Sequence, residues 1–353
     1  MPTPPTAARQ TPRLVLLLLL TLLTAAAAAA TGCRVTDRQV LGTANQAHGQ
    51  LKPAVIDDPV LTNYMEAMER RIIDAATELR DVPKSHQQED ASWMFDPSRM
   101  KFHFVNSKTI NAFTTGGEHM YVYTGLLMAC ETEDELAAVM CHEYAHVFAR
   151  HVQQGTSRQY WMYGAAAAGA VAGAALGASG DGDNEDALKY GGMGAGAGLL
   201  AGRLVGMGFT REDEHEADKL GFRMYVRAGW DPDRFADFFK KMIALGYDTT
   251  PELASDHPTL RSRVEYAQAQ AAEARDRARR WRREPVASPG EFERLQARAR
   301  ELARDMPNDN SLEDAQTLLA SFSSCVAPVA QPEQVRARKR VVAEVERSQA
   351  GQR

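Results

Sequence analysis

The pentapeptide His142-Glu143-Tyr144-Ala145-His146 places two imidazoles and a carboxylate at a spacing that suits a metal-dependent hydrolase. On an α-helix, residues four positions apart lie one turn above each other on the same face. His142 and His146 can therefore converge on one metal ion, while Glu143 can reach a metal-bound water as a general base. The alternative is that the motif occurs by chance on a solvated helix face.

The flanking residues predict that the motif lies in the middle of a helix. Thr132 and Glu135 have the spacing of a capping box, so we expect a helix to begin near Glu133. Gly155 is the expected end of this helix. Its apolar positions are Leu136, Val139, Met140 and Phe148.

A third nearby histidine, His151, is not expected to bind the metal. It lies nine residues past His142, which on one continuous helix is a rotation of about 900° and points it to the opposite side. The metzincin pattern would require glycine and histidine where this chain has Ala149 and Val152. We interpret His151 as a surface or packing residue.

A catalytic zinc ion takes three protein ligands and keeps one position open for water. The downstream run from Arg211 to Asp218 offers the third ligand, in the pattern ExxAD. Glu214 would bind the metal, and Asp218, one turn later, would accept a hydrogen bond from a zinc-bound imidazole. Spacing alone leaves Glu212, Glu216 and His215 as competing ligands, and an acidic solvated helix face as the alternative without a metal.

An ordered set of motifs around these residues resembles metallopeptidase family 48, of the HtpX and CAAX prenyl protease type, and most closely its periplasmic lipoprotein members. The resemblance covers about residues 50 to 270. The chain departs from the commoner pattern at Thr115, where proline is frequent, and at Cys141, where glycine is frequent. The matching segments are Asn111-Ala112-Phe113, Gly116-Gly117, Tyr121 to Leu127, Glu133 to His146, Glu214 to Gly221, Asp256-His257-Pro258 and Arg263.

The resemblance implies an α+β fold, mostly helical, of the gluzincin type, with a small β-sheet beside the active-site helix. It implies one Zn²⁺ per chain, held by His142, His146 and Glu214, with Glu143 as the base of an endopeptidase. His257 resembles a histidine that approaches the metal in some members and blocks or assists catalysis. The alternative is that His257 packs or caps its own turn.

A short apolar run near the N-terminus determines the expected compartment. Arg9 and Arg13 precede Leu14 to Leu23, which is too short for an ordinary membrane span and suits a signal peptide. An alanine tract then leads to Ala30-Thr31-Gly32-Cys33, which resembles a bacterial lipobox. We predict that residues 1–32 are a lipoprotein signal peptide and that Cys33 is lipidated. An ordinary signal peptide is the alternative.

These features predict an exported protein of the bacterial cell envelope with a simple domain order. Arg34 is not the aspartate associated with inner-membrane retention, so we expect a lipid anchor in the outer membrane, facing the periplasm. Residues 33–49 would form a linker, 50–270 the zinc metallopeptidase domain, and 271–353 a charged helical tail. The expected substrates are misfolded or unassembled envelope proteins.

The segment 164–206 is rich in glycine and alanine. Small residues can let helices pack closely in membranes, but each half of the segment is too short to span one. We favour a helical pair or a flap over the active site, with an integral-membrane protease as the alternative. A non-proteolytic assembly factor on the same fold is a further alternative. The net charge of −5 gives no indication of nucleic-acid binding.

The segment before the motif predicts one helix and two short strands. Residues from Pro59 to Leu79 form an amphipathic pattern, and Phe102 to Val105 form the first strand. The second strand follows a glycine turn, and we expect it to be an edge strand that binds an extended peptide. Its residues are Met120, Tyr121, Val122 and Tyr123.

Three cysteines remain after Cys33, and an exported protein can oxidise two of them. We interpret Cys141 as a small packing residue, with a disulfide as the alternative. The other two are Cys130 and Cys325.

Overall fold

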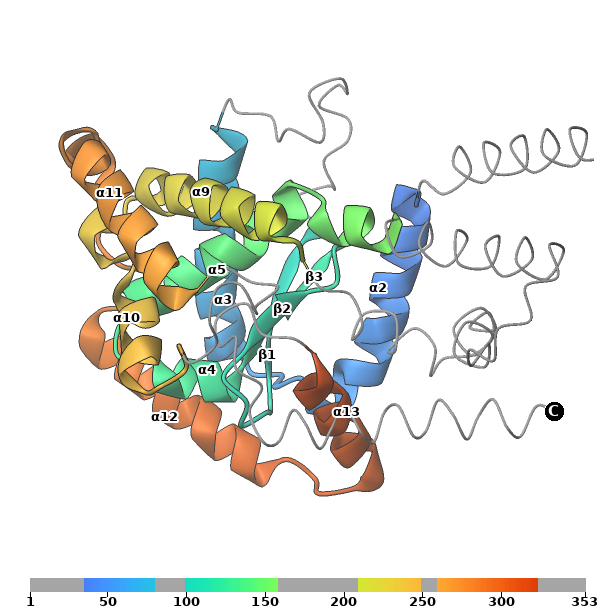
Figure 1. The fold of residues 1–353 in the computed structure, drawn as a ribbon. Coiled ribbons are helices and arrows are strands. Elements are labelled where there is room, and N and C mark those ends of the chain that lie inside the picture. The colour runs from blue at the N-terminus through green and yellow to red at the C-terminus, as the bar shows by residue number, and fades with distance from the viewer. Residues whose placement is uncertain (1–34, 80–98, 158–208, 249–258, 323–353) are drawn as a thin grey trace, which may run out of the picture. The chain divides into compact units, whose positions relative to one another are not determined.

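The computed structural model describes residues 35–79, 99–157, 209–248 and 259–322. By its contacts the chain divides into two units, and residues 36–155 and 195–353 make up the second. Of the first unit only residues 35, 156 and 157 are described, and in it the Val35 amide donates a hydrogen bond to Ser157 Oγ at 3.3 Å. The elements below belong to the second unit (Figure 1).

In the described ranges, the second unit consists of helices around one small sheet, which confirms the mostly helical α+β fold. In chain order, the elements are α2 (Asp37–Leu51), η1 (Lys52–Ala54), α3 (Pro59–Thr77), β1 (Lys101–Val105), β2 (Ala112–Thr114), β3 (His119–Tyr123), α4 (Thr124–Ala129), α5 (Glu133–Phe148), α9 (Arg211–Ala228), η5 (Pro232–Arg234), α10 (Asp237–Ala244), α11 (Leu260–Ala278), η7 (Arg279–Trp281), α12 (Pro289–Asp305) and α13 (Asn310–Ser321).

The sheet has the strand order β1-β3-β2, with β1 parallel and β2 antiparallel to β3. The expectation that Met120 to Tyr123 form a free edge is therefore wrong, because β3 is the central strand and both its sides are paired. The sequence analysis missed β2, which is only three residues long and follows no alternating pattern that could reveal it. Gly116, with a φ of 74°, turns the chain from β2 into β3, as the glycine pair predicts.

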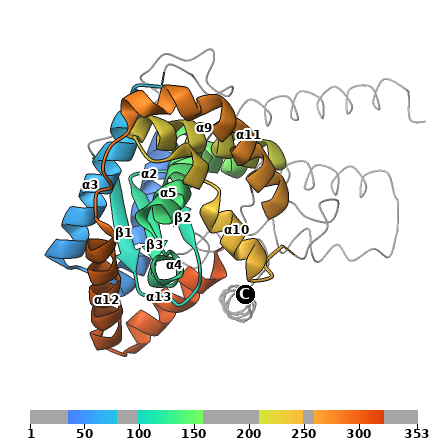
Figure 2. The same cartoon turned by 90° about the vertical axis from the view of Figure 1, so that its left-hand side faces the viewer.

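The two faces of β3 belong to two different hydrophobic clusters, because successive side chains on a strand point to opposite faces. Met120 and Val122 pack into the main core with α3, α5 and α9, whereas Tyr121 and Tyr123 pack under α13. The Tyr123 hydroxyl donates a hydrogen bond to the Leu319 carbonyl at 2.6 Å. Helix α13 therefore covers one face of the sheet (Figure 2).

Two expected boundaries fall inside helices. The predicted start of the tail at residue 271 lies within α11, and the predicted linker 33–49 contains most of α2. A capping box between Thr36 and Gln39 begins α2. Its buried face then docks the helix onto the rest of the unit; that face consists of Val40, Ala44, Ala47 and Leu51.

Helix α5 begins at Glu133 as predicted, but the capping box does not form. Thr132 makes no capping hydrogen bond, and the Glu135 carboxylate instead accepts from the Glu131 amide and from Lys241 Nζ, both at 2.6 Å. The helix also ends at Phe148 and not at Gly155, because Arg150 adopts a left-handed conformation with a φ of 57°.

Several predictions from the sequence concern residues outside the described ranges: Cys33, Cys325, His257 and the segment 164–206. Cys130 and Cys141 are both buried free thiols, so no disulfide joins them. Within the ranges that the structure describes, no helix is long and apolar enough to cross a membrane.

The Glu133 side chain joins the start of the active-site helix to the segment before α12. Its buried carboxylate accepts hydrogen bonds from the amides of Val286 and Ala287, at 2.7 and 2.6 Å, and from Trp230 Nε1 at 3.0 Å. Hydrogen bonds to a charged acceptor are stronger than neutral ones, and a buried donor that loses its acceptor is costly. This carboxylate therefore holds two distant parts of the chain together.

Replacing Glu133 by Ala should lower the free energy of unfolding by about 2–4 kcal/mol, because three buried donors lose their acceptor. Urea titration followed by circular dichroism measures this change. Glu293→Ala, an exposed change on α12, is the matched control and should stay within about 0.5 kcal/mol of the wild type. Equal stabilities for the two variants would contradict the proposed role of Glu133.

Candidate metal centre

The side chains of His142, His146 and Glu214 converge in the interior, between α5 and α9. The Nε2 atoms of the two histidines are 3.1 Å apart. Glu214 Oε2 lies 3.4 Å from His142 Nε2, and Glu214 Oε1 lies 3.9 Å from His146 Nε2. All three side chains have at most 1% of their surface exposed.

The structure distinguishes Glu214 from the other candidate ligands on the same helix. Glu212 and His215 are exposed on α9, and Glu216 is only partly buried. Of these four residues, only Glu214 lies with the two histidines in a group that could hold a metal ion. The spacing argument could not make this choice, because it depends on which face of α9 meets α5.

Gly221 allows the two helices to approach closely enough for this convergence. A Cβ atom at this position would lie 3.0 Å from both the backbone N and Cα of His142. A capping box between Thr210 and Asp213 begins α9 one turn before Glu214. Figures 1 and 2 show α9 running alongside α5, so the ligands come from two packed, regular helices.

His142 is oriented by a buried ion pair. Its Nδ1 donates a hydrogen bond to Asp218 Oδ1 at 3.0 Å, and Arg263 Nη2 donates to the same oxygen at 2.7 Å. The Arg263 guanidinium also lies over the Phe239 ring, 4.1 Å from its centroid. The sequence predicted the role of Asp218, whereas Arg263 entered only as part of a family pattern.

The groups around His142 shift its pKa in opposite directions. Burial and Arg263 both oppose protonation of His142, but the acceptors Asp218 and Glu214 outweigh them and raise its pKa to about 9. Burial alone would raise the pKa of Asp218, yet Arg263 and His142 hold it below its usual value. Asp218 is therefore ionised, and it accepts the Nδ1 proton of His142, so that Nε2 is the nitrogen that faces Glu214 and His146.

His146 is held by His151, so the prediction that His151 faces away from the site is wrong. The two Nδ1 atoms are 2.9 Å apart, and His151 Nε2 lies 3.3 Å from Glu216 Oε2. Phe209 stacks on the His146 ring, with ring centroids 3.8 Å apart. Burial lowers the pKa of His146 well below its usual value, so the ring is neutral.

The error came from treating the residues after the motif as one continuous helix. The left-handed conformation of Arg150 breaks the helical phase, and residues 151–157 begin a new helical segment. The chain therefore brings His151 back beside His146. No residue type at position 150 signals this break, because arginine rarely adopts a positive φ.

Glu143, the predicted base, lies on α5 beside the first ligand and has 1% of its surface exposed. Burial raises the pKa of Tyr123 well above its usual value, and the nearby Glu143 carboxylate adds to this shift. Glu143 thus lies in the interior, near Tyr123 of the sheet.

The donor set fits a metal ion. Two imidazoles, each with one nitrogen held by a partner, and one carboxylate form a three-ligand set with atoms within 4.8 Å of one another. This set is typical of catalytic metal centres that leave one position open. The fold and the site together define a metallopeptidase in which one helix carries both histidines and the adjacent glutamate.

Comparison with known proteins agrees with this class. Residues 84–271 match the model of peptidase family M48, so the chain belongs to that family. The beta-barrel assembly-enhancing protease of Escherichia coli (strain K12) is 30% identical over 249 residues, 69% of this chain and 44% of that protein. The mitochondrial metalloendopeptidase OMA1 of Arabidopsis thaliana is 24% identical over 232 residues, 66% of this chain and 44% of that protein.

These two relatives are named as a protease and a metalloendopeptidase. The matched region spans less than half the length of each of these two relatives.

Replacing His142, His146 or Glu214 by Ala should each lower the bound metal by one ion per chain, because each change removes one of three ligands. Metal analysis of the dialysed proteins measures this loss. Glu212→Ala, a change of an exposed carboxylate on the same helix, should keep the wild-type content. If Glu214→Ala retains all its metal, the assignment of the third ligand is wrong.

His151→Ala should weaken metal binding by about 10–100-fold, the usual effect of removing a partner that orients a ligating histidine. Competition with a coloured chelator measures the affinity. His215→Ala is the control, because this histidine is exposed on α9. An affinity equal to that of the control would leave His151 with a packing role only.

Proposed function

We propose that this chain is a zinc-dependent endopeptidase that hydrolyses misfolded or unassembled proteins of the bacterial envelope, with Glu143 as general base. The observation that carries this proposal is the buried convergence of His142, His146 and Glu214, with Glu143 on the same helix as the two histidines. The names of the relatives, a protease linked to β-barrel assembly and a metalloendopeptidase, support peptide hydrolysis.

Each residue of the site has its own role in the proposed hydrolysis. When bound, zinc supplies Lewis-acid chemistry that lowers the pKa of a water molecule and polarises a peptide carbonyl. Glu143 accepts the proton of the attacking water and delivers it to the leaving amine. Asp218 and His151 hold the two ligating imidazoles in the tautomers that direct Nε2 inward. The apolar surroundings of α5 exclude bulk water.

In this proposal the substrate pairs with β2 and not with β3. Among the described strands β2 pairs only with β3, so its other side offers an edge for an extended peptide. Strand β2 also packs against α5. Pairing through the backbone reads few side chains, which suits substrates of varied sequence.

We further propose that Cys33 carries the lipid that anchors the protein in the outer membrane, facing the periplasm. The basic, apolar and small-residue segments before Cys33 support this.

We also propose that His257 approaches the metal and blocks or assists catalysis. The residues after it support this, because Arg263, six positions later, reaches both Asp218 and His142.

Glu143→Gln should keep the metal and the fold but lower casein hydrolysis by about 10²–10⁴-fold, because an amide cannot accept the proton of water. Release of labelled peptides measures the rate, and metal analysis confirms that the site is loaded. Glu212→Gln, an exposed change of the same kind on α9, is the matched control.

Near wild-type hydrolysis by Glu143→Gln would show that Glu143 is not the base. Absence of hydrolysis in the metal-loaded wild type and in both variants would instead favour a non-proteolytic assembly factor.

A further inference from the structure

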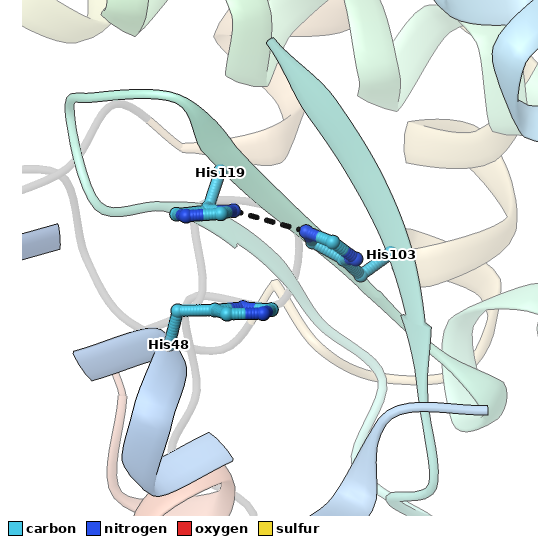
Figure 3. Close-up of side chains that lie close together, drawn as sticks. All are labelled: His48, His103 and His119. Atoms are coloured by element: carbon cyan, nitrogen blue, oxygen red, sulfur yellow. Dashed lines mark hydrogen bonds between the residues drawn. The ribbon is translucent and has the colours of Figure 1, made fainter. Parts of the chain in front are cut away.

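A second group of three histidines lies outside the active site, where α2 faces the sheet (Figure 3). His48 comes from α2, His103 from β1 and His119 from the start of β3. His103 and His119 lie two register positions apart on neighbouring parallel strands, so both can point to the same face of the sheet. The sequence analysis assigned no role to these residues, because only the fold brings them together.

The three rings are close enough to share one metal ion. His103 Nε2 lies 3.0 Å from His119 Nδ1, and the His48 ring stacks on the His119 ring with centroids 4.2 Å apart. One nitrogen from each ring lies within 4.8 Å of the other two, the same criterion that the active-site ligands meet. Two ligands on one zinc ion are about 3.3 Å apart when each Zn–N bond is about 2.0–2.1 Å.

Two of the rings are already held through their outer nitrogens. His119 Nε2 donates a hydrogen bond to Asn45 Oδ1 at 3.1 Å, and His48 Nδ1 lies 3.0 Å from the Tyr121 hydroxyl. Metal-binding histidines are usually held in this way, with one nitrogen bonded to the protein and the other directed at the metal. The arrangement leaves His119 Nδ1 and His48 Nε2 as the nitrogens that can bind a metal.

The rings are in the chemical form that binds metals. Burial, together with the neighbouring imidazoles, lowers the pKa of His103 to about 3, and burial and His48 lower that of His119 to about 4. Burial therefore favours the neutral imidazole, which is the form that coordinates a metal.

A cavity of about 320 Å³ reaches this group, and His48 and His103 form part of its lining. The lining also includes ionisable residues of both signs. These residues are Lys52, Asp57, Glu66, Glu69 and Lys101. An entry path is one of the features that a genuine metal site needs.

We propose that His48, His103 and His119 form a second metal site, for a divalent late first-row transition ion such as Zn²⁺ or Cu²⁺. Three imidazole nitrogens suit these ions, whereas Mg²⁺ and Ca²⁺ prefer oxygen ligands. The bound ion would clamp α2 to β1 and β3, because its ligands come from all three elements. This site is independent of the proposed hydrolysis.

Counting zinc ions in four forms of the full chain tests the proposal. Each protein is stripped of metal, dialysed against the same buffered free zinc and analysed for bound zinc. The wild type should bind two ions, His103→Ala one, His146→Ala one, and the double variant none. His215→Ala, which changes an exposed histidine outside both groups, should bind two.

Thermal unfolding provides the second readout. Zinc should raise the Tm of His146→Ala, in which only the new site is intact, and should leave the Tm of the double variant unchanged. A wild type that binds a single ion, or a His103→Ala variant that binds as many as the wild type, would overturn the proposal.

A spectroscopic measurement covers the case in which His103→Ala fails to fold. Cu²⁺ added to His146→Ala should give an electron paramagnetic resonance spectrum with couplings from several imidazole nitrogens. A spectrum without these couplings would also overturn the proposal.

Discussion

The close contact between α5 and α9 is the constraint on which the metal centre depends. Two ligands come from α5 and one from α9, so the separation of the two helices sets whether one ion can reach all three. Gly221 decides this separation, because any side chain there would meet the backbone of His142 at 3.0 Å. A larger residue would separate the helices and move Glu214 away from the histidines. The packing of a core is intolerant of such shifts.

The two ligating histidines are oriented by different means. His142 contacts Asp218, which forms an ion pair with Arg263. The charges of Asp218 and Arg263 compensate each other in the interior. His146 contacts the ring of His151, which in turn contacts Glu216 at a partly exposed position. One side of the centre is therefore buried and charge-balanced, while the other leads toward the surface. The partners of His146 therefore lie closer to solvent than the partners of His142.

Much of the fold and the site could be predicted from local patterns. The helix α3 and the strand β3 follow from periodicity, and the pairing of His142 with His146 follows from helical spacing, whereas the choice of Glu214 came from the family resemblance. The errors share one cause, which is that they depend on contacts between distant segments. The break at Arg150, the central place of β3 and the docking of α2 are all set by tertiary packing, which local sequence does not encode.

The positions of His151 and Phe209 have a consequence for chain continuity. Both residues touch His146, although a segment of 57 residues separates them in the sequence. Among the described residues, the halves of the metal centre are held together by the packing of α5 against α9. A polypeptide cut inside this segment would keep every ligand, and the two fragments could assemble as separate chains into one centre.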